Sequence, residues 1–269
     1  MRIVSLLATA GLAVVLAGQA EAQSRRGFEI GVEGYRYDYE EEFEGVQIVQ
    51  DEGRLFGLTA SYGRALGSWD FEVSGRAAGG EVDYRSNEGD RLDDVVQATV
   101  QLELTAGRPM QLSPTVTLTP FVGLGARGHG DSSGGLTTDT GLSGYDRYLF
   151  YAYAPLGLAA DVRTGPGTSL TVSGQYNLFL GGDSEAEFGD VDPEAPTVEL
   201  ELEDGSGWAF SAEVNHAVGR GTVSFGPFVR IWDVEQSAAQ VFEEDGFEIE
   251  IFEPANRTVE AGLKLAYRF

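Results

Sequence analysis

The sequence predicts a closed antiparallel β-barrel that crosses a membrane with about ten strands. Three observations predict it. Apolar and polar residues alternate along most of the chain, the connections between the alternating runs sort by length, and aromatic residues gather at the run ends. A hydrophobic fraction of 42% with a mean hydropathy of −0.15 is too polar for a bundle of membrane helices. Eight or twelve strands are the alternative counts.

Residues 1–22 have the features of a secretory signal peptide. Arg2 supplies a positive charge, residues 3–17 are apolar, and an A-x-A cleavage pattern ends at Ala22. The apolar stretch is shorter than the ~20 residues of a spanning helix. We therefore expect cleavage after Ala22 and a single barrel over residues 23–269.

Ten runs of alternating residues follow. Successive side chains of a strand point to opposite faces, so each run has one apolar and one polar face. The runs occupy residues 28–32, 56–62, 69–77, 96–104, 116–126, 148–160, 170–180, 208–214, 225–231 and 259–269. Most are near the ~9–11 residues that a tilted strand needs to cross a bilayer. We interpret residues 197–217 as one strand projecting beyond the membrane and 247–251 as the outer part of the last strand. The alternative makes each a separate strand and gives twelve.

The connections alternate between short and long. Short turns follow the even-numbered runs, and long polar stretches follow the odd ones, at about residues 38–52, 83–94, 128–144, 181–205 and 235–256. Short periplasmic turns and long extracellular loops are the pattern of bacterial outer-membrane barrels. A soluble sandwich has no reason to sort its loops in this way.

Aromatic residues at the run ends predict two girdles, because amphipathic rings prefer the water–lipid interfaces. The expected long-loop girdle contains Tyr35, Tyr37, Tyr39, Tyr145, Tyr148 and Trp208, and the expected short-turn girdle contains Tyr62, Trp69, Tyr267 and Phe269.

The polar face predicts the lining of the lumen. Its charged members are Glu29, Glu33, Asp70, Glu72, Arg76, Glu103, Arg127, Arg147, Asp161, Glu213, Arg230, Glu260, Lys264 and Arg268. Acids and bases nearly balance, and we expect them to pair because an isolated buried ion is costly. Around eight strands an interior is only wide enough to be filled by side chains, and ten is little wider. We therefore expect a polar plug, with a narrow gated conduit as the alternative.

The charge balance excludes several classes of function. With 18 Lys+Arg against 43 Asp+Glu, the chain would repel nucleic acid. The absence of Cys excludes disulfides and thiolate zinc sites. Most of the acidic excess falls in the long loops, where we expect a solvated surface and no metal site or cofactor. Beside anionic lipopolysaccharide, this surface needs bridging divalent cations. We expect a monomer with lipid and lipopolysaccharide as partners.

The end of the sequence resembles the insertion signal of Gram-negative outer-membrane proteins. The matching residues are Gly262, Leu265, Tyr267 and Phe269. The resemblance implies recognition by the barrel-assembly machinery. Residues 35–39, 120–128, 131–134 and 143–157 look similar to uncharacterised proteobacterial barrels of porin-like outer-membrane families, which supports the architecture and implies no activity.

Ten strands is also the size of the omptin outer-membrane proteases, whose activity depends on an Asp pair and an Asp/His pair in the extracellular mouth. His129 is predicted at the start of a long loop, where it could meet an acid, and His216 near a short turn. Neither lies in an Asp-x-His pair, and the Asp190-x-Asp192 spacing falls in an acidic loop. We therefore expect no catalytic site. The favoured function is a structural or interaction-bearing outer-membrane barrel, followed by a narrow channel for small polar or cationic solutes and then by a surface enzyme.

Overall fold

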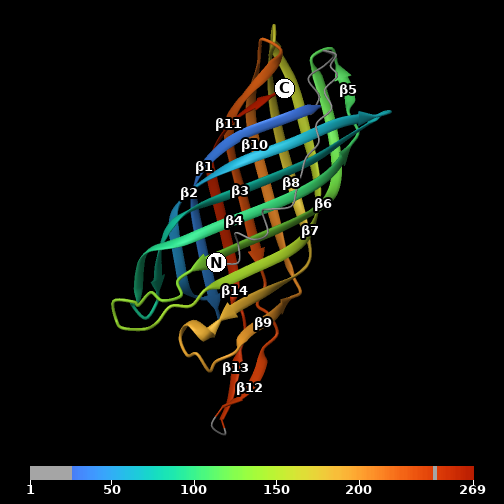
Figure 1. Cartoon of the computed structure of the whole chain (residues 1–269). Helices are drawn as coiled ribbons and strands as arrows, with labels where there is room; N and C mark the ends of the chain where they lie inside the picture. Colours follow the sequence, from blue (N-terminus) through green and yellow to red (C-terminus); the bar gives the residue numbers. More distant parts are fainter. Residues whose placement is uncertain (1–25, 245–246) are drawn as a thin grey trace.

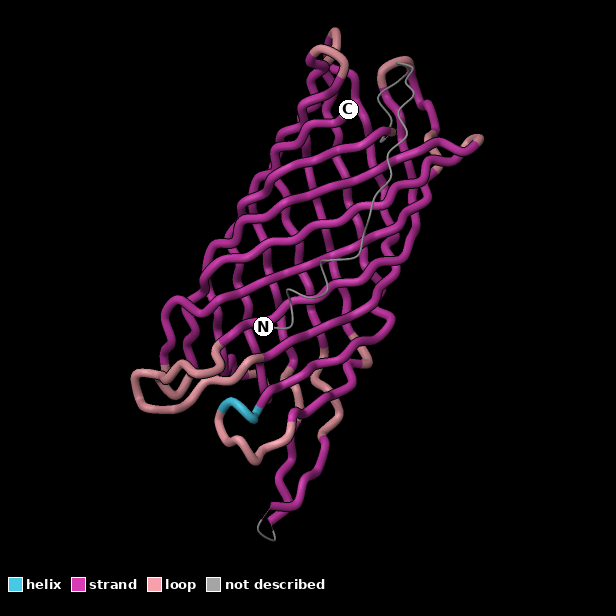
Figure 2. Tube along the Cα trace, viewed as in Figure 1, coloured by secondary structure: helices cyan, strands magenta, loops and turns pink. Residues whose placement is uncertain are grey.

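A computed structural model describes residues 26–244 and 247–269; the expected signal peptide lies outside the described residues. About 79% of the described chain is β-strand (Figures 1 and 2). The elements are β1 (Gly27–Phe43), β2 (Val46–Leu66), β3 (Trp69–Ser86), β4 (Arg91–Gly107), β5 (Met110–Ser113), β6 (Val116–Ser132), β7 (Arg147–Gly165), β8 (Thr168–Glu187), the 3₁₀ turn η2 (Phe188–Asp190), β9 (Thr197–Leu202), β10 (Gly205–Val218), β11 (Gly221–Val234), β12 (Gln240–Glu244), β13 (Phe247–Ile251) and β14 (Ala255–Arg268). In this part of the chain no helix is long and apolar enough to span a membrane.

Ten strands close into one antiparallel ring, which confirms the predicted fold class and strand count (Figure 1). The order around the ring is β10-β11-β14-β1-β2-β3-β4-β6-β7-β8, and β8 pairs with β10 to close it. Closure pairs both sides of every strand in the ring. A membrane barrel needs this because lipid offers no partner to an unpaired N–H or C=O group.

Two strand interpretations were wrong. The expected strand over residues 197–217 is interrupted between Leu202 and Gly205, although β9 and β10 both pair with β8 in one register. The expected outer part of the last strand is instead β13, which pairs with β12 in a separate hairpin. Pro254 explains this break, since it has no N–H group to continue the ladder and β14 begins directly after it.

Strand covers much of the predicted long loops, except at residues 133–144. The ladder of β1 and β2 continues through the expected first loop to a two-residue turn at Glu44 and Gly45, both with positive φ (52° and 77°). Similarly, β3 continues to Ser86 and β4 already begins at Arg91, so most of the expected second loop is strand. The polar residues there still alternate between inside and outside, so the barrel wall continues beyond its apolar part.

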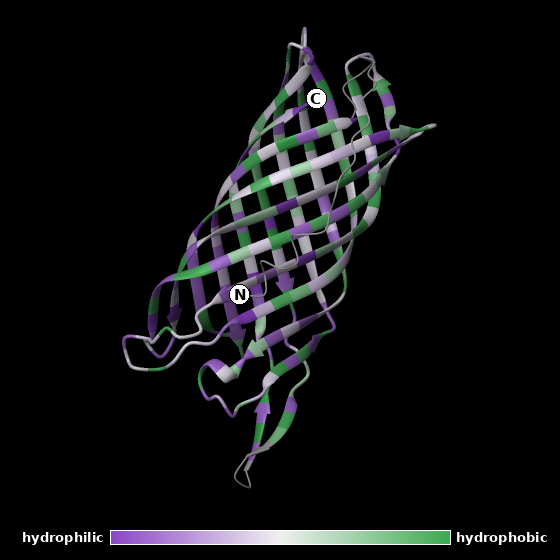
Figure 3. Ribbon diagram, in the orientation of Figure 1, coloured by the Kyte–Doolittle hydropathy of each residue, from purple (hydrophilic) through white to green (hydrophobic). Residues whose placement is uncertain are grey.

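Hydrophobic and hydrophilic residues alternate along the strands of the barrel (Figure 3), and the exposed hydrophobic side chains form the predicted apolar belt on the outer surface. Phe56 is 69% exposed and Leu102 is 59% exposed, whereas the interior residues Tyr37 and Glu260 are 1% and 0% exposed. Such sidedness is the reverse of a soluble domain and suits a wall facing lipid.

Two outward ion pairs, which we call the outward rim, end the apolar belt on the long-loop side of β1, β2, β11 and β14. Arg36 lies 2.6 Å from Glu52, and Arg257 lies 3.1 Å from Asp233, with both guanidiniums exposed. Strand residues beyond this rim therefore lie outside the lipid-facing segment.

One group of aromatic residues was assigned to the wrong face. Tyr35, Tyr37 and Tyr39 were expected in the long-loop girdle, but all three are buried in the lumen. They have the parity of Glu29 and Glu33, which the polar-face pattern placed inside. Run-end position was thus a weaker indicator than parity. By contrast, the expected girdle residues Tyr62, Trp69, Trp208 and Phe269 are exposed on the outer surface.

Inward glycines accommodate inward aromatic rings of the neighbouring strands. Gly125 pairs with Tyr153, and the ring occupies the place of a side chain at Gly125. Gly207 pairs with Trp232, whose Cε3 atom would lie 2.7 Å from an added Cβ. The rings of Tyr153 and Trp232 therefore lie over the backbone of the adjacent strands, at the positions of these glycines.

The substitution Gly125→Val is expected to destabilise the barrel by about 1–3 kcal/mol, because the Tyr153 ring must move. The matched control is Gly165→Val, since an added Cβ at Gly165 meets nothing within 4 Å. The measurement is the urea midpoint of both variants in lipid vesicles. Equal midpoints would show that the glycine is not needed for packing.

Candidate functional site: the barrel lumen

A layer of ion pairs crosses the middle of the lumen. Glu33 of β1 and Glu260 of β14 face arginines from three other strands. Arg127 lies 2.7 Å and Arg76 2.8 Å from the Glu260 carboxylate, and Arg230 lies 2.8 Å from Glu33. Arg127 and Glu260 have fully buried side chains. The structure thus brings together residues from five strands that lie far apart in the sequence, and their opposite charges compensate for lost hydration.

An aromatic layer packs against these ion pairs. Tyr151 and Tyr153 contact Trp232, with ring centroids 5.0 Å and 4.9 Å apart, and Phe179 contacts Tyr151 at 5.5 Å. The guanidinium of Arg127 lies 5.8 Å from the Trp232 ring centroid. Because this layer is also buried, side chains fill the lumen at this level.

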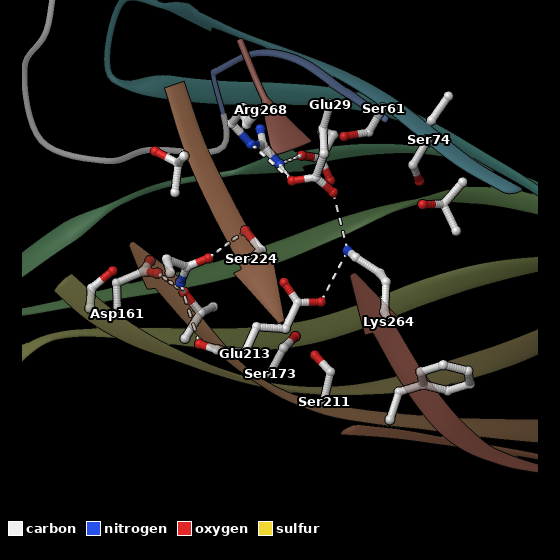
Figure 4. A pocket seen from close by; sticks show the side chains of 18 of the residues that line it. Glu29, Ser61, Ser74, Asp161, Ser173, Ser211, Glu213, Ser224, Lys264 and Arg268 are labelled. Carbon is white, nitrogen blue, oxygen red and sulfur yellow. Dashed lines mark hydrogen bonds and ion pairs between the residues drawn. The ribbon is translucent and has the colours of Figure 1, made fainter. Parts of the chain in front are cut away.

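The short-turn half of the lumen is hollow. A cavity of about 1010 Å³ extends from this end to the level of Trp232 and Arg230. Its walls carry serine, threonine and amide side chains (Figure 4). Lys264 bridges Glu29 at 3.1 Å and Glu213 at 3.0 Å. The expected plug is therefore restricted to the middle and outer parts of the barrel, a difference that parity alone could not indicate.

The remaining predicted lumen residues have varied partners. Arg268 lies 2.8 Å from Glu29 and 3.7 Å from Glu72. Glu103 accepts hydrogen bonds from Tyr153, Gln101 and Gln175. Asp70 pairs with Arg26, and Asp161 accepts from Thr171. For Glu103 and Asp161, hydroxyl and amide donors take the place of the expected bases.

At the long-loop end, four carboxylates surround Arg147. We call Glu41, Asp51, Asp131, Arg147 and Glu253 the mouth cluster. Arg147 forms an ion pair with Glu41 and lies 3.4 Å from Asp131, 3.9 Å from Glu253 and 4.0 Å from Asp51. Glu41 and Asp51 lie beyond the outward rim on their strands, Arg147 begins β7, and Glu253 precedes β14. The cluster therefore lies at the outer limit of the barrel.

The mouth cluster corrects the expectation of solvated loop acids. Glu41, Asp51 and Glu253 are each only 4% exposed. Burial raises the pKa of Asp51 to about 8, with a further rise from the charge of Asp131. Burial likewise raises the pKa of Glu253 to about 7, although Arg147 opposes the rise. Glu41 and Asp51 occupy the alternate positions that face inward on their strands, and this alternation could have predicted from the sequence that both are buried.

The two histidines are not arranged as a shared site. His129 lies within β6 rather than at the start of a loop, and its Nδ1 atom is 3.3 Å from the Tyr37 hydroxyl. His216 lies near the short turns as predicted, 2.9 Å from Thr168. Asp190 lies in η2, where its side chain accepts from the backbone N–H of Asp146. Within residues 26–244 and 247–269, no three His, Cys, Asp or Glu side chains are placed to hold a metal ion.

The expected insertion-signal residues lie on β14. Gly262 lies under Tyr35 of β1, where a Cβ would overlap the Tyr35 side chain. Leu265 is exposed on the outer surface. The rings of Tyr267 and Phe269 are 4.9 Å apart near the short-turn end. Packing thus gives Gly262 a role within the barrel; recognition by an assembly machinery stays a prediction.

No family model and no curated protein match the sequence. Among solved structures, the outer membrane protease OmpT from Escherichia coli is similar with a TM-score of 0.58 and 11% identity, covering 93% of this chain and 99% of that one. An outer membrane channel from Pseudomonas putida F1 has a TM-score of 0.41 and 11% identity, covering 95% and 100%. The likeness to OmpT shows that this chain has the fold of an outer-membrane β-barrel protein.

Proposed function

We propose that this chain is an integral outer-membrane protein whose lumen is closed to solutes and whose role is structural or interaction-bearing, without a catalytic activity. The observation that carries the proposal is the pair of stacked layers in mid-lumen. Arg127, Glu260 and Trp232 are at most 1% exposed, and they meet from different walls of the barrel. A solute would have to displace both the ion pairs and the rings.

The apolar belt and the likeness to OmpT support a location in the outer membrane. In this placement the short turns face the periplasm and the acidic end faces outward. Exposed acids such as Asp192 and Glu199 would repel anionic lipopolysaccharide unless divalent cations bridge the two. The Gly262–Phe269 pattern would direct insertion by the assembly machinery, and the barrel would remain a monomer.

Purified protein is expected to produce no discrete conductance steps in planar bilayers. Insertion is verified by heat-modifiable gel migration of the protein from the same vesicles. A porin inserted into the same bilayers is the positive control, which shows that the assay detects an open barrel. Steps with cation preference from the unaltered chain would overturn the closed reading.

A narrow channel for small polar or cationic solutes is the second candidate. The specific observation that favours it is the cavity of about 1010 Å³, which extends from the short-turn end to the mid-lumen layers. A channel would require those layers to open, and an acidic mouth would concentrate cations. Conductance steps that appear only above a threshold of the applied voltage, and disappear below it, would favour this candidate over a permanently closed barrel.

A further inference from the structure

The mouth cluster holds more negative charge than its neighbours can neutralise. It contains four carboxylates and one guanidinium, all largely removed from water. The Oδ1 atom of Asp51 is buried without a hydrogen-bond partner, and its Oδ2 atom lies 4.0 Å from Arg147. An ionised carboxylate in that position would be expensive, whereas a protonated one is tolerated.

The surrounding titratable groups do not supply a second cation. Facing the cluster are Tyr37, Tyr39 and Glu41 from β1, Asp51 from β2, Tyr84 from β3, His129 and Asp131 from β6, Tyr145 and Arg147 at the start of β7, and Glu253 before β14. His129 is buried beside Arg127 and Arg147, which disfavours a third positive charge there. Protons are therefore the available way to reduce the excess.

Glu253 connects this cluster to the base of the β12–β13 hairpin. Its carboxylate accepts from Ser184 at 2.8 Å and from Tyr39 at 3.4 Å. Its backbone N–H donates to the Ser237 side chain at 2.9 Å, and its carbonyl accepts from the Ser237 N–H at 3.0 Å. Glu253 thus attaches both segments that lead into the hairpin to the barrel wall. The hairpin itself projects beyond the barrel (Figure 1).

We propose that the mouth cluster is a proton-operated latch: with protons shared among its carboxylates it fixes the base of the β12–β13 hairpin against the barrel mouth, and losing them releases the hairpin. This inference rests on the proposed placement of the mouth outside the membrane, where the external pH reaches it. Arg147 holds the cluster together while the charge is reduced. Once Asp51 and Glu253 ionise, their mutual repulsion and their buried charge favour separation.

The sign of the pH dependence follows from the direction of the two shifts. Both acids bind a proton more tightly in the latched state than in water, where they ionise near pH 4. The latch is therefore most stable at acidic pH, weakens as the pH rises from about 4 toward 8, and weakens no further above that range.

The absence of Cys allows a direct test by spin labelling. Nitroxide labels on Ala239→Cys, at the hairpin base, and Asn87→Cys, in the turn after β3, are placed in the full chain in lipid nanodiscs. Both positions are exposed. Pulsed electron paramagnetic resonance measures the distance between the two labels. At pH 5 we expect a narrow distribution of short distances, and at pH 9 a broad distribution of longer distances.

Two variants separate the latch from general effects of pH. Asp51→Asn/Glu253→Gln keeps the shape of both side chains without their charge and is expected to retain the pH 5 distribution at pH 9. Glu248→Gln, an exposed acid on β13, is the matched control and should respond to pH like the parent. An unchanged distribution in the parent from pH 5 to 9, or an equal pH response in the neutralised variant, would overturn the inference. Neither readout depends on conductance, so a conducting barrel would leave this result intact.

Discussion

Replacing Glu260 by glutamine is expected to destabilise the barrel by about 3–5 kcal/mol. Glu260 forms ion pairs with Arg76, Arg127 and Arg230, and its side chain is fully buried. Glu260→Gln therefore leaves Arg127 buried without an ionised partner. The measurement is the free energy of unfolding in urea, with the protein in lipid vesicles.

Two further variants test whether uncompensated charge is the cause. Arg127→Met/Glu260→Met removes both partners and should cost less than Glu260→Gln alone, because apolar side chains can replace a buried ion pair. Glu199→Gln removes an exposed carboxylate of β9 and should be within about 0.5 kcal/mol of the parent. A double variant less stable than the single one would mean that packing rather than charge dominates.

Arginine at Leu102 is expected to destabilise the inserted barrel by about 2–4 kcal/mol, because Leu102 lies on the lipid-facing wall of β4. Its neighbour Gln101 points inward, where its Nε2 atom donates to Glu103 at 3.0 Å. Gln101 also accepts a hydrogen bond from Arg76 at 2.9 Å, so Gln101→Arg would place a cation between a carboxylate and a guanidinium. Because Gln101 lines the cavity, water can hydrate this cation, and the substitution should cost less than Leu102→Arg.

The measurement for this pair is the fraction of folded protein in vesicles, from heat-modifiable migration across a urea series. Gly165→Val serves as a variant with little expected effect. Equal losses for Leu102→Arg and Gln101→Arg would show that the two faces of β4 are not the lipid and lumen faces.

Parity along the strands predicted more of this protein than any motif did. It placed Glu33, Arg76 and Glu260 on the inner wall, and the structure brings them into one layer. Parity also places Tyr35, Tyr37 and Tyr39 inside, but their position at a run end was given more weight and put them in the girdle. Side-chain direction follows from backbone geometry, whereas the interfacial preference of tyrosine is only a tendency.

The outer half of the barrel was less predictable because its strands carry acidic residues. Runs such as Asp38–Glu42 have the composition of a loop, yet the ladder of β1 and β2 includes them. In this half, hydrogen bonds to neighbouring strands maintain the wall without an apolar face. Prediction from composition therefore made the strands too short. For the same reason it treated the buried acids of the mouth cluster as solvent-exposed loop residues.

Local alternation and turn chemistry determined the fold class of this protein. Backbone periodicity decides which residues face lipid and which face inward. The wall must close because lipid offers no hydrogen-bond partners to a free strand edge. Only the tertiary structure decided which inward groups meet. Arg127 reaches Glu260 across 133 positions of sequence, and Arg147 reaches Glu41 across 106. Those meetings depend on strand tilt, register and the space left by opposing side chains, which no single strand encodes.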